Sequence, residues 1–190
     1  ANIALSVTLT AVATLVAPIM TPFLMKTLAG SFVPIDFIAM MTSIFKIVII
    51  PVLLGLVFNY FFHGKAKWLD KAMPIISMAG IGFIIMIITA AGRDDLLSIG
   101  LLLILAAIIH NLLGYVFGYW GCRIFGMSEQ DCRTIAFEVG MQNGGLATGI
   151  ALEMGKISTV GLAPAIFGPW MNISGSSLAT WWRDKEPKKK

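Results

Sequence analysis

The 190-residue chain is 57% hydrophobic and 13% charged, about half the ~25% charge that is usual in soluble domains, and its mean hydropathy is +0.85. This composition excludes a soluble globular domain and predicts an all-α integral membrane protein in a lipid bilayer. The formal net charge is +4, but the basic residues lie in short loops and in the tail. Membrane topology therefore explains the charge better than nucleic-acid binding, and no nucleic-acid partner is expected.

Six apolar segments are long enough to cross a bilayer, which takes about 20 residues each. They run over residues 2–25, 34–62, 72–91, 97–125, 128–154 and 158–182. The first carries Ser6, Thr10 and Thr14 at every fourth position, so their hydroxyls share one helix face. This face either lines a polar site or packs against another helix. The second segment is long for one span, so its first part is expected along the membrane interface, with Lys46 near the outer surface.

The fourth segment has polar residues at mid-depth. His110 and Asn111 are followed by Gly114 and Gly118, a GxxxG pair that predicts close contact with another helix. His110 is interpreted as a hydrogen-bonded structural histidine, and a proton relay is the alternative. The two cysteines lie near one short loop and are interpreted as reduced thiols.

The fifth segment contains the stretch FEVGMQNGGLA, which places the carboxylate of Glu138 among glycines and amides. A carboxylate at bilayer depth costs at least ~2.5–3.5 kcal/mol, so it needs a partner. The glycines predict that the helix is interrupted here, and the freed carbonyls need partners too. A metal cation would satisfy both needs. The alternative is an unbroken helix whose Glu138 bonds to a neighbouring helix.

Charge in the loops predicts the orientation. Ten basic residues lie on one side of the membrane, in the loops between spans two and three and between four and five and in the tail, against three on the other side. The positive-inside rule then places the basic loops and the C-terminus in the cytoplasm. The chain opens inside an apolar run without an initiator Met, so it is expected to be a piece of a longer protein.

Four stretches give the chain a resemblance to a known family. They are ALSVTLTAVATL, IHNLLGY, EVGMQNGGLA and WMNISGSSLA, in this order along the whole chain. The chain resembles the bile acid:sodium symporter family, especially its bacterial members. The resemblance implies a ten-helix inverted-repeat transporter, of which this chain would supply helices five to ten, and it implies an inner-membrane location. The implied units are a core-domain helix at 1–33, panel-domain helices at 34–92, core-domain helices at 93–183 with a discontinuous crossing helix around 138–145, and a basic cytoplasmic tail at 184–190.

The resemblance also implies a site. One sodium ion would be bound by the hydroxyls of Ser6 and Thr10, and Glu138 would serve both ions. The second ion would take the carbonyls of Val139 and Met141 and the side chain of Gln142. The predicted substrate-facing residues are Asn143, Met171 and Asn172. Bile-acid-binding members usually have His where this chain has Met171, so bile acids, pyruvate, pantoate-like acids and other organic anions all stay open.

These features predict sodium-coupled symport of an organic anion, bile acid-like or a small carboxylate, by alternating access. A proton-coupled organic acid carrier and a non-transporting half-size membrane subunit are the alternatives. No nucleophile–base pair or metal-ligand cluster stands out in the sequence, so we expect no enzymatic activity and no cofactor, with sodium as coupling ion only. The expected partners are the anion, sodium, lipid and the missing N-terminal helices of the same transporter.

Overall fold

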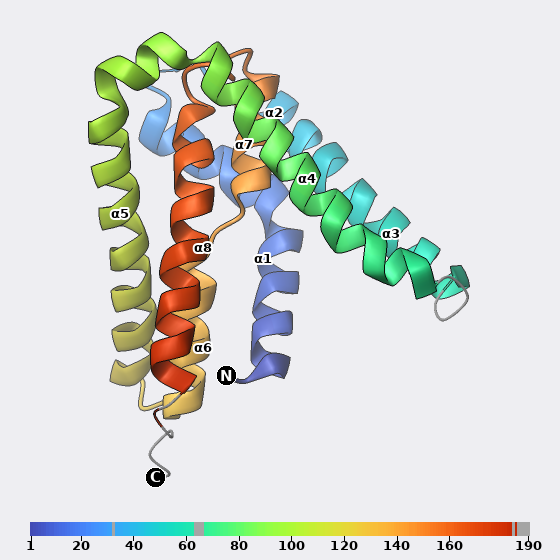
Figure 1. Cartoon of the computed structure of the whole chain (residues 1–190), viewed down its shortest axis with the longest axis vertical. Helices are drawn as coiled ribbons and strands as arrows, with labels where there is room; N and C mark the ends of the chain where they lie inside the picture. Colours follow the sequence, from blue (N-terminus) through green and yellow to red (C-terminus); the bar gives the residue numbers. More distant parts are fainter. Residues whose placement is uncertain (32, 63–66, 184, 186–190) are drawn as a thin grey trace.

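A computed structural model describes residues 1–31, 33–62, 67–183 and 185, and the regular structure of these residues is entirely helical. Figure 1 shows the helices in chain order. Their bounds are α1 (Ile3–Leu24), the π-helical η1 (Met25–Ala29), α2 (Phe37–Ile44), the π-helical η2 (Phe45–Ile49), α3 (Ile50–Phe62), α4 (Lys67–Ala91), α5 (Arg93–Ile124), α6 (Glu129–Gly140), α7 (Gly144–Glu153) and α8 (Leu162–Arg183).

Within the described residues, four helical stretches are long and apolar enough to cross a membrane. They are Ile3–Ala29, Phe37–Phe62, Lys71–Ala91 and Arg93–Ile124. α6 and α7 have 12 and 10 residues, so neither reaches across alone. α8 has 22 residues but contains the polar run MNISGSS. The chain is thus a multi-pass helical membrane protein, whereas six complete spans stay a prediction.

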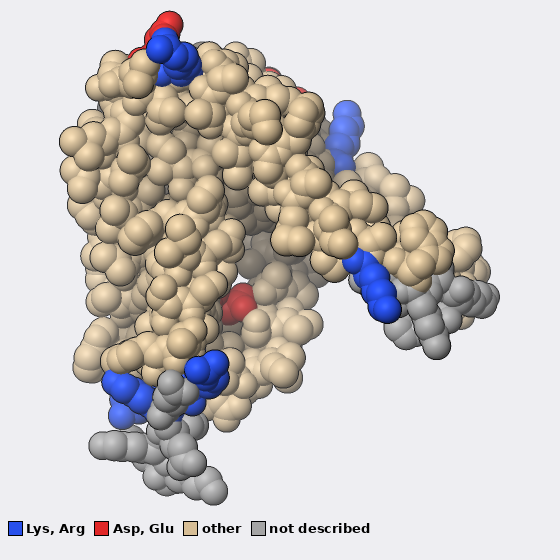
Figure 2. All heavy atoms as spheres, in the orientation of Figure 1, with Lys and Arg blue, Asp and Glu red and all other residues tan. Residues whose placement is uncertain are grey.

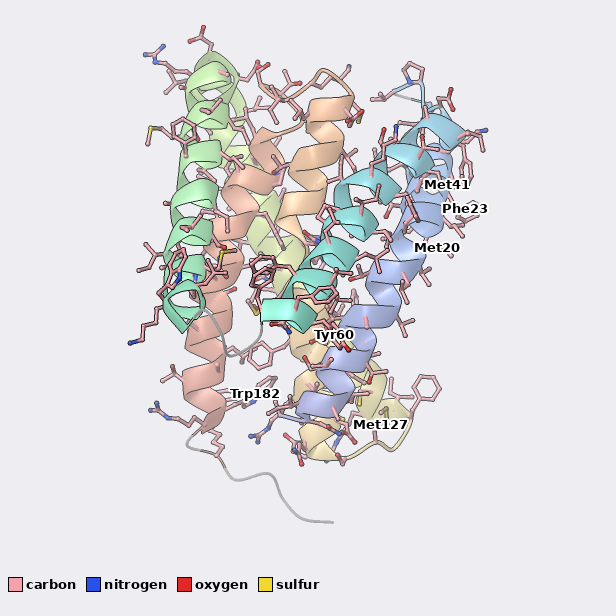
Figure 3. All side chains as sticks on the ribbon, turned by 90° about the vertical axis from the view of Figure 1, so that its right-hand side faces the viewer. Met20, Phe23, Met41, Tyr60, Met127 and Trp182 are labelled. Atoms are coloured by element: carbon pink, nitrogen blue, oxygen red, sulfur yellow. The ribbon has the colours of Figure 1, made fainter. Side chains whose placement is uncertain are left out.

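The outer surface of the helices is apolar, as a lipid-facing surface must be. Leu15 is 68% exposed and Phe83 is 61% exposed, and exposed Ile, Leu, Val and Phe side chains line α1 to α5. Figure 3 shows Met20 and Phe23 pointing outward from α1, and both side chains are exposed. A surface of this kind in water would be a large aggregation-prone patch, so its natural solvent is hydrocarbon.

α5, α6 and α8 form the most closely packed part of the protein. α1 contacts α6 and α2, α7 contacts α8 and α2, and α4 contacts α8 and α5. In Figure 1 both chain termini lie at the lower end, where α6 also begins. At the opposite end, the buried side chains of Ile88, Leu162 and Ala165 form a small apolar cluster that joins α4 to α8. The result is a helical bundle with α1 beside the junction of α6 and α7.

Helix boundaries differ from the predicted ones in two ways. The predicted spans 72–91 and 97–125 leave a gap between them, but only Gly92 separates the two helices, because α5 already begins at Arg93 with Asp94 and Asp95 in its first turn. A Cβ at Gly92 would lie 2.2 Å from the carbonyl oxygen of Ser158, so this tight turn requires glycine. The second difference is the two π-helical segments: η1 continues the first helix beyond the predicted end at residue 25, and η2 lies within the predicted span 34–62. Prolines lie close to both, and a proline removes one helical hydrogen bond.

The predicted GxxxG contact is confirmed between α5 and α6. A Cβ at Gly114 would lie 2.9 Å from Cα of Gly140, and a Cβ at Gly118 would lie 2.8 Å from Cα of Ala136. The two backbones therefore touch directly, which leaves no room for a side chain on this face of α5.

Gly118→Val is expected to destabilise the protein by about 1–3 kcal/mol, the usual cost of overpacking a close contact. Gly121→Val is the matched control, because a Cβ at Gly121 meets nothing within 4 Å on the same helix. Unfolding of both variants in detergent measures the difference. Equal losses of stability would contradict the close contact and point to the helix propensity of valine instead.

Candidate ion-binding site

The chain is interrupted between α6 and α7, within the stretch where glycines predicted a break. The amide of Met141 makes the last backbone bond of α6, to the carbonyl of Phe137 at 2.8 Å. Met141 itself is extended, and Asn143 then starts α7 by accepting a hydrogen bond from the amide of Leu146 at 2.9 Å. The carbonyl end of one helix and the amide end of the next therefore meet in the same region, and each end carries backbone groups without helical partners.

Glu138 lies two residues before the end of α6 and is half-buried. Its two carboxylate oxygens accept hydrogen bonds from two hydroxyls of α1, one from Ser6 and one from Thr10, the latter at 2.7 Å. The structure thus brings together three of the predicted sodium ligands. Thr14 is not part of this group, because its hydroxyl donates to the carbonyl of Thr10 in its own helix. The alternative of an unbroken helix is wrong, although Glu138 does bond to a neighbouring helix as that alternative supposed.

A second set of polar contacts fixes α1 against α6, and sequence reasoning missed it. The amide of Asn2 donates to the hydroxyl of Thr134 at 2.7 Å, and its side-chain nitrogen donates to Asp131 at 2.9 Å. The Asn2 side-chain oxygen also caps α1 by accepting from the amide of Leu5. This arrangement sets the register that places Ser6 and Thr10 opposite Glu138. An N-cap type residue before the first apolar run was the only sequence signal for it.

The other predicted ion ligands lie at the carbonyl end of α6. The side-chain oxygen of Gln142 lies 3.0 Å from Nε2 of His110, and its nitrogen donates to the carbonyl of Val139 at 3.4 Å. The interpretation of His110 as a hydrogen-bonded histidine is confirmed by this contact. Val139 and Met141 flank the last residue of α6, so their carbonyls lie at the break. Val139, Met141 and Gln142 follow Glu138 closely along the chain. The hydrogen bonds described for Gln142 go to His110 and Val139 and not to Glu138.

The predicted substrate residues do not gather in one cavity. Asn143 lines a cavity of about 290 Å³ together with His110, Gln142 and Phe167. Met171 and Asn172 do not line it. Asn172 is exposed on α8, and the carbonyl of the half-buried Met171 lies 3.1 Å from the hydroxyl of Ser174. The cavity therefore borders the break on the side of α5 and α8.

The first turns of α6 are anchored to α5 and α8 by a largely buried ion pair. Nε of Arg133 lies 2.9 Å from Glu129, and both side chains are 14% exposed. Tyr119 of α5 donates to the same carboxylate at 2.8 Å. Arg133 also donates to the carbonyls of Trp182 and Lys185 at 3.1 and 2.8 Å, which satisfies the end of α8. Figure 3 shows Trp182 at this lower end of the molecule.

The donor set around Glu138 suits a hard monovalent cation. Carboxylate, hydroxyl and carbonyl oxygens are the groups that such ions prefer. In the structure, the hydroxyls of Ser6 and Thr10 point their protons at the carboxylate. If a cation lay between the hydroxyls and the carboxylate, each hydroxyl would keep its proton and would only have to rotate to present a lone pair to the cation. The carboxylate charge, otherwise costly in the membrane, would then be offset.

A family model describing the sodium bile acid symporter family matches residues 1–99. The chain belongs to this family. It is therefore a member of a transporter family and not an enzyme. The match includes Ser6 and Thr10, and curated relatives of this family match almost the whole chain, including the stretch around Glu138.

Two of these relatives show what share of a family member's length the chain covers. It is 38% identical over 189 residues to the uncharacterized sodium-dependent transporter YocS of Bacillus subtilis, covering 99% of the chain and 58% of YocS. It is 33% identical over 187 residues to the probable sodium/metabolite cotransporter BASS1 of Arabidopsis thaliana, a chloroplastic protein, covering 98% of the chain and 47% of BASS1. The chain thus spans about half the length of the curated symporter-family relatives that it matches.

Proposed function

We propose that this chain is the C-terminal six-helix portion of a sodium-coupled symporter that carries an organic anion by alternating access. One observation supports this most strongly. The hydroxyls of Ser6 and Thr10 converge on both oxygens of Glu138, beside a break in its helix. A charged group in this setting needs a counter-charge, and a broken helix is where membrane carriers bind ions. The names of the relatives, a sodium-dependent transporter and a sodium/metabolite cotransporter, agree with this proposal.

The proposed cycle begins with sodium. Sodium takes oxygens from Ser6, Thr10 and Glu138, and a second ion takes the carbonyls of Val139 and Met141 and the side chain of Gln142. Offsetting the charge of Glu138 holds α1 against α6 and fixes both ends of the break. Asn143 and Asn172 are then preorganised for the anion, and the core helices move against the panel helices. Linkage requires that sodium and the anion raise each other's affinity by the same factor.

The substrate that we propose is an organic anion, with a small carboxylate favoured over a bile acid. Met171 stands where bile-acid-binding members usually have His, so one polar contact for a bile acid is lacking. The cavity beside the break, about 290 Å³, is also small. A small carboxylate would have its charge near the amide end of α7, where unpaired N–H groups attract anions.

We propose that the protein lies in the inner membrane. In the proposed orientation, its C-terminus is in the cytoplasm. Figure 2 shows basic side chains gathered at the end where the C-terminus lies. Arg123 and Arg133 belong to this end, in agreement with the positive-inside rule. Lys65 and Lys188 to Lys190, which were counted in the prediction, lie outside the described residues. The core, panel and tail assignments remain part of the proposal.

The test is uptake by the full-length protein in proteoliposomes, with radiolabelled pyruvate and taurocholate as probes. An inward sodium gradient is compared with an equal potassium gradient and with a pH gradient in potassium. We expect that uptake of one of the two probes is faster with the inward sodium gradient than with the potassium gradient, and that the pH gradient in potassium does not raise it. Uptake driven as well by the pH gradient without sodium would instead support the proton-coupled carrier. Failure of both probes to accumulate, together with no effect of sodium on protein stability, would favour the half-size subunit.

A further inference from the structure

Asn111 is the fully buried member of the polar pair His110 and Asn111 on the largely apolar α5. Its side chain is 0% exposed on α5. A buried amide destabilises a protein unless its hydrogen bonds are made, and here both ends make one. The nitrogen donates to the carbonyl of Gly140 at 2.9 Å, and the oxygen accepts from the hydroxyl of Ser174 at 2.6 Å. The contact therefore joins α5, α6 and α8 at a single side chain.

The hydrogen bonds of this group run in one direction. If the amide of Asn111 were turned over, its oxygen would face the carbonyl oxygen of Gly140, and two acceptors would meet. The hydroxyl of Ser174 has one proton and two acceptors within reach, the oxygen of Asn111 at 2.6 Å and the carbonyl of Met171 at 3.1 Å. The shorter contact assigns the proton to Asn111. Tyr115, whose hydroxyl lies 3.1 Å from that of Ser174, is then the donor in their contact. The chain of donors runs from Tyr115 to Ser174, to Asn111 and to the carbonyl of Gly140.

The carbonyl at the end of this chain is the last one of α6, next to the break. In an unbroken helix it would accept a bond from the amide four residues on, and Asn111 takes that role here. The break is packed from both sides as well. A Cβ at Gly140 would lie 2.2 Å from the ring of Tyr115, and a Cβ at Gly175 would lie 2.9 Å from the sulfur of Met141. Backbone on either side of the Gly140 carbonyl thus has little freedom to move.

We propose that Asn111 and Ser174 are positioning residues for the sodium site. They do not touch the ion. They hold the end of α6 so that the carbonyls of Val139 and Met141 lie where the ion needs them. The same bond connects the ion site to α8, which carries Asn172 two residues before Ser174. This inference rests on the proposed function, because it concerns the same ion site.

The test uses sodium alone, so it does not require the substrate. Sodium affinity of the purified full-length protein is measured by binding of radioactive sodium in a potassium background, and melting temperature is measured in potassium. Ser174→Ala should weaken sodium affinity about fivefold, the effect of losing an average hydrogen bond. It should also lower the melting temperature in potassium, because the buried oxygen of Asn111 loses its donor. Ser174→Thr, which keeps the hydroxyl, should restore the affinity.

Ser177→Ala is the matched control on the same helix, because the one bond of the Ser177 hydroxyl within the described residues goes to the carbonyl of Ile173. If Ser174→Ala and Ser177→Ala bind sodium equally well, the inference is wrong. It is also wrong if Ser174→Ala lowers only the melting temperature. A wild type that binds no sodium would overturn the proposed function instead.

If Ser174→Ala does not fold, Tyr115→Phe tests the inference. It removes the hydroxyl that donates to Ser174 and should weaken sodium affinity about twofold, because hydrogen bonds in a chain strengthen one another. Unchanged affinity in Tyr115→Phe would then overturn the inference.

Discussion

Glu138→Gln is expected to reduce sodium-driven uptake at least about a hundredfold, equivalent to ~2.7 kcal/mol of ion or transition-state stabilisation. Glutamine has almost the same shape and keeps one side-chain oxygen, so Ser6 and Thr10 still find a partner and the fold is retained. It lacks the negative charge, however. In a medium of low dielectric, a cation held only by neutral oxygens loses its main attraction. The measurement is initial uptake over a range of sodium concentrations.

The control for this prediction is Glu153→Gln. Glu153 ends α7, the second half of the same broken helix, and within the part of the chain that the structure describes its exposed carboxylate accepts one weak bond, of 3.2 Å, from Ser43. Removing that charge should leave the sodium dependence of uptake unchanged. If Glu138→Gln kept uptake with an unaltered sodium half-saturation, Glu138 would not be the coupling residue.

Arg133→Met is expected to lower the free energy of unfolding by about 3 kcal/mol, the lower end of the range for removing one partner of a buried ion pair. Methionine keeps part of the apolar stem but leaves Glu129 as a largely buried charge with only Arg123 at 3.5 Å and Tyr119 for partners. The carbonyls of Trp182 and Lys185 also lose their donor. The measurement is equilibrium unfolding in detergent.

Arg93→Met is the matched comparison for Arg133. The ion pair of Arg93 with Asp94 has side chains that are 72% and 95% exposed, so its loss should cost about 0–1 kcal/mol. Equal effects of the two substitutions would show that Arg133 does not anchor α6 to α8. A larger effect of Arg93→Met would contradict the anchoring role of Arg133 more strongly.

Local sequence predicted the features that depend on a few neighbouring residues. The glycines on both sides of Gln142 indicated the break, because glycine and polar residues disfavour a continuous helix in lipid. Gly114 and Gly118 indicated a close contact, because their spacing places both on one face. The cost of burying Glu138 indicated that it must have a partner, and the hydroxyls of Ser6 and Thr10 provide it.

Features that depend on how helices rotate against one another could not be predicted. Ser6, Thr10 and Thr14 share one face, yet Thr14 turns back to its own helix because the broken helix ends before reaching it. The sequence did not indicate the hydrogen-bond partners of Asn111, because they are 29 and 63 residues away along the chain. Asn2 bonds across more than 100 residues for the same reason. Such pairs follow only from the packing of α5, α6 and α8, and from that of α1 on α6.

Binding of radioactive sodium to the full-length protein tests most directly whether α1 and Glu138 form an ion site. The variant Ser6→Ala with Thr10→Ala removes the two hydroxyls that reach the carboxylate. The variant Thr8→Ala with Thr14→Ala removes two hydroxyls of the same helix that donate to carbonyls of α1 itself. We predict that the first variant binds sodium at least about tenfold more weakly than the wild type, a loss of ~1.4 kcal/mol, and that the second binds it normally. Equal sodium affinity in the two variants would contradict the account.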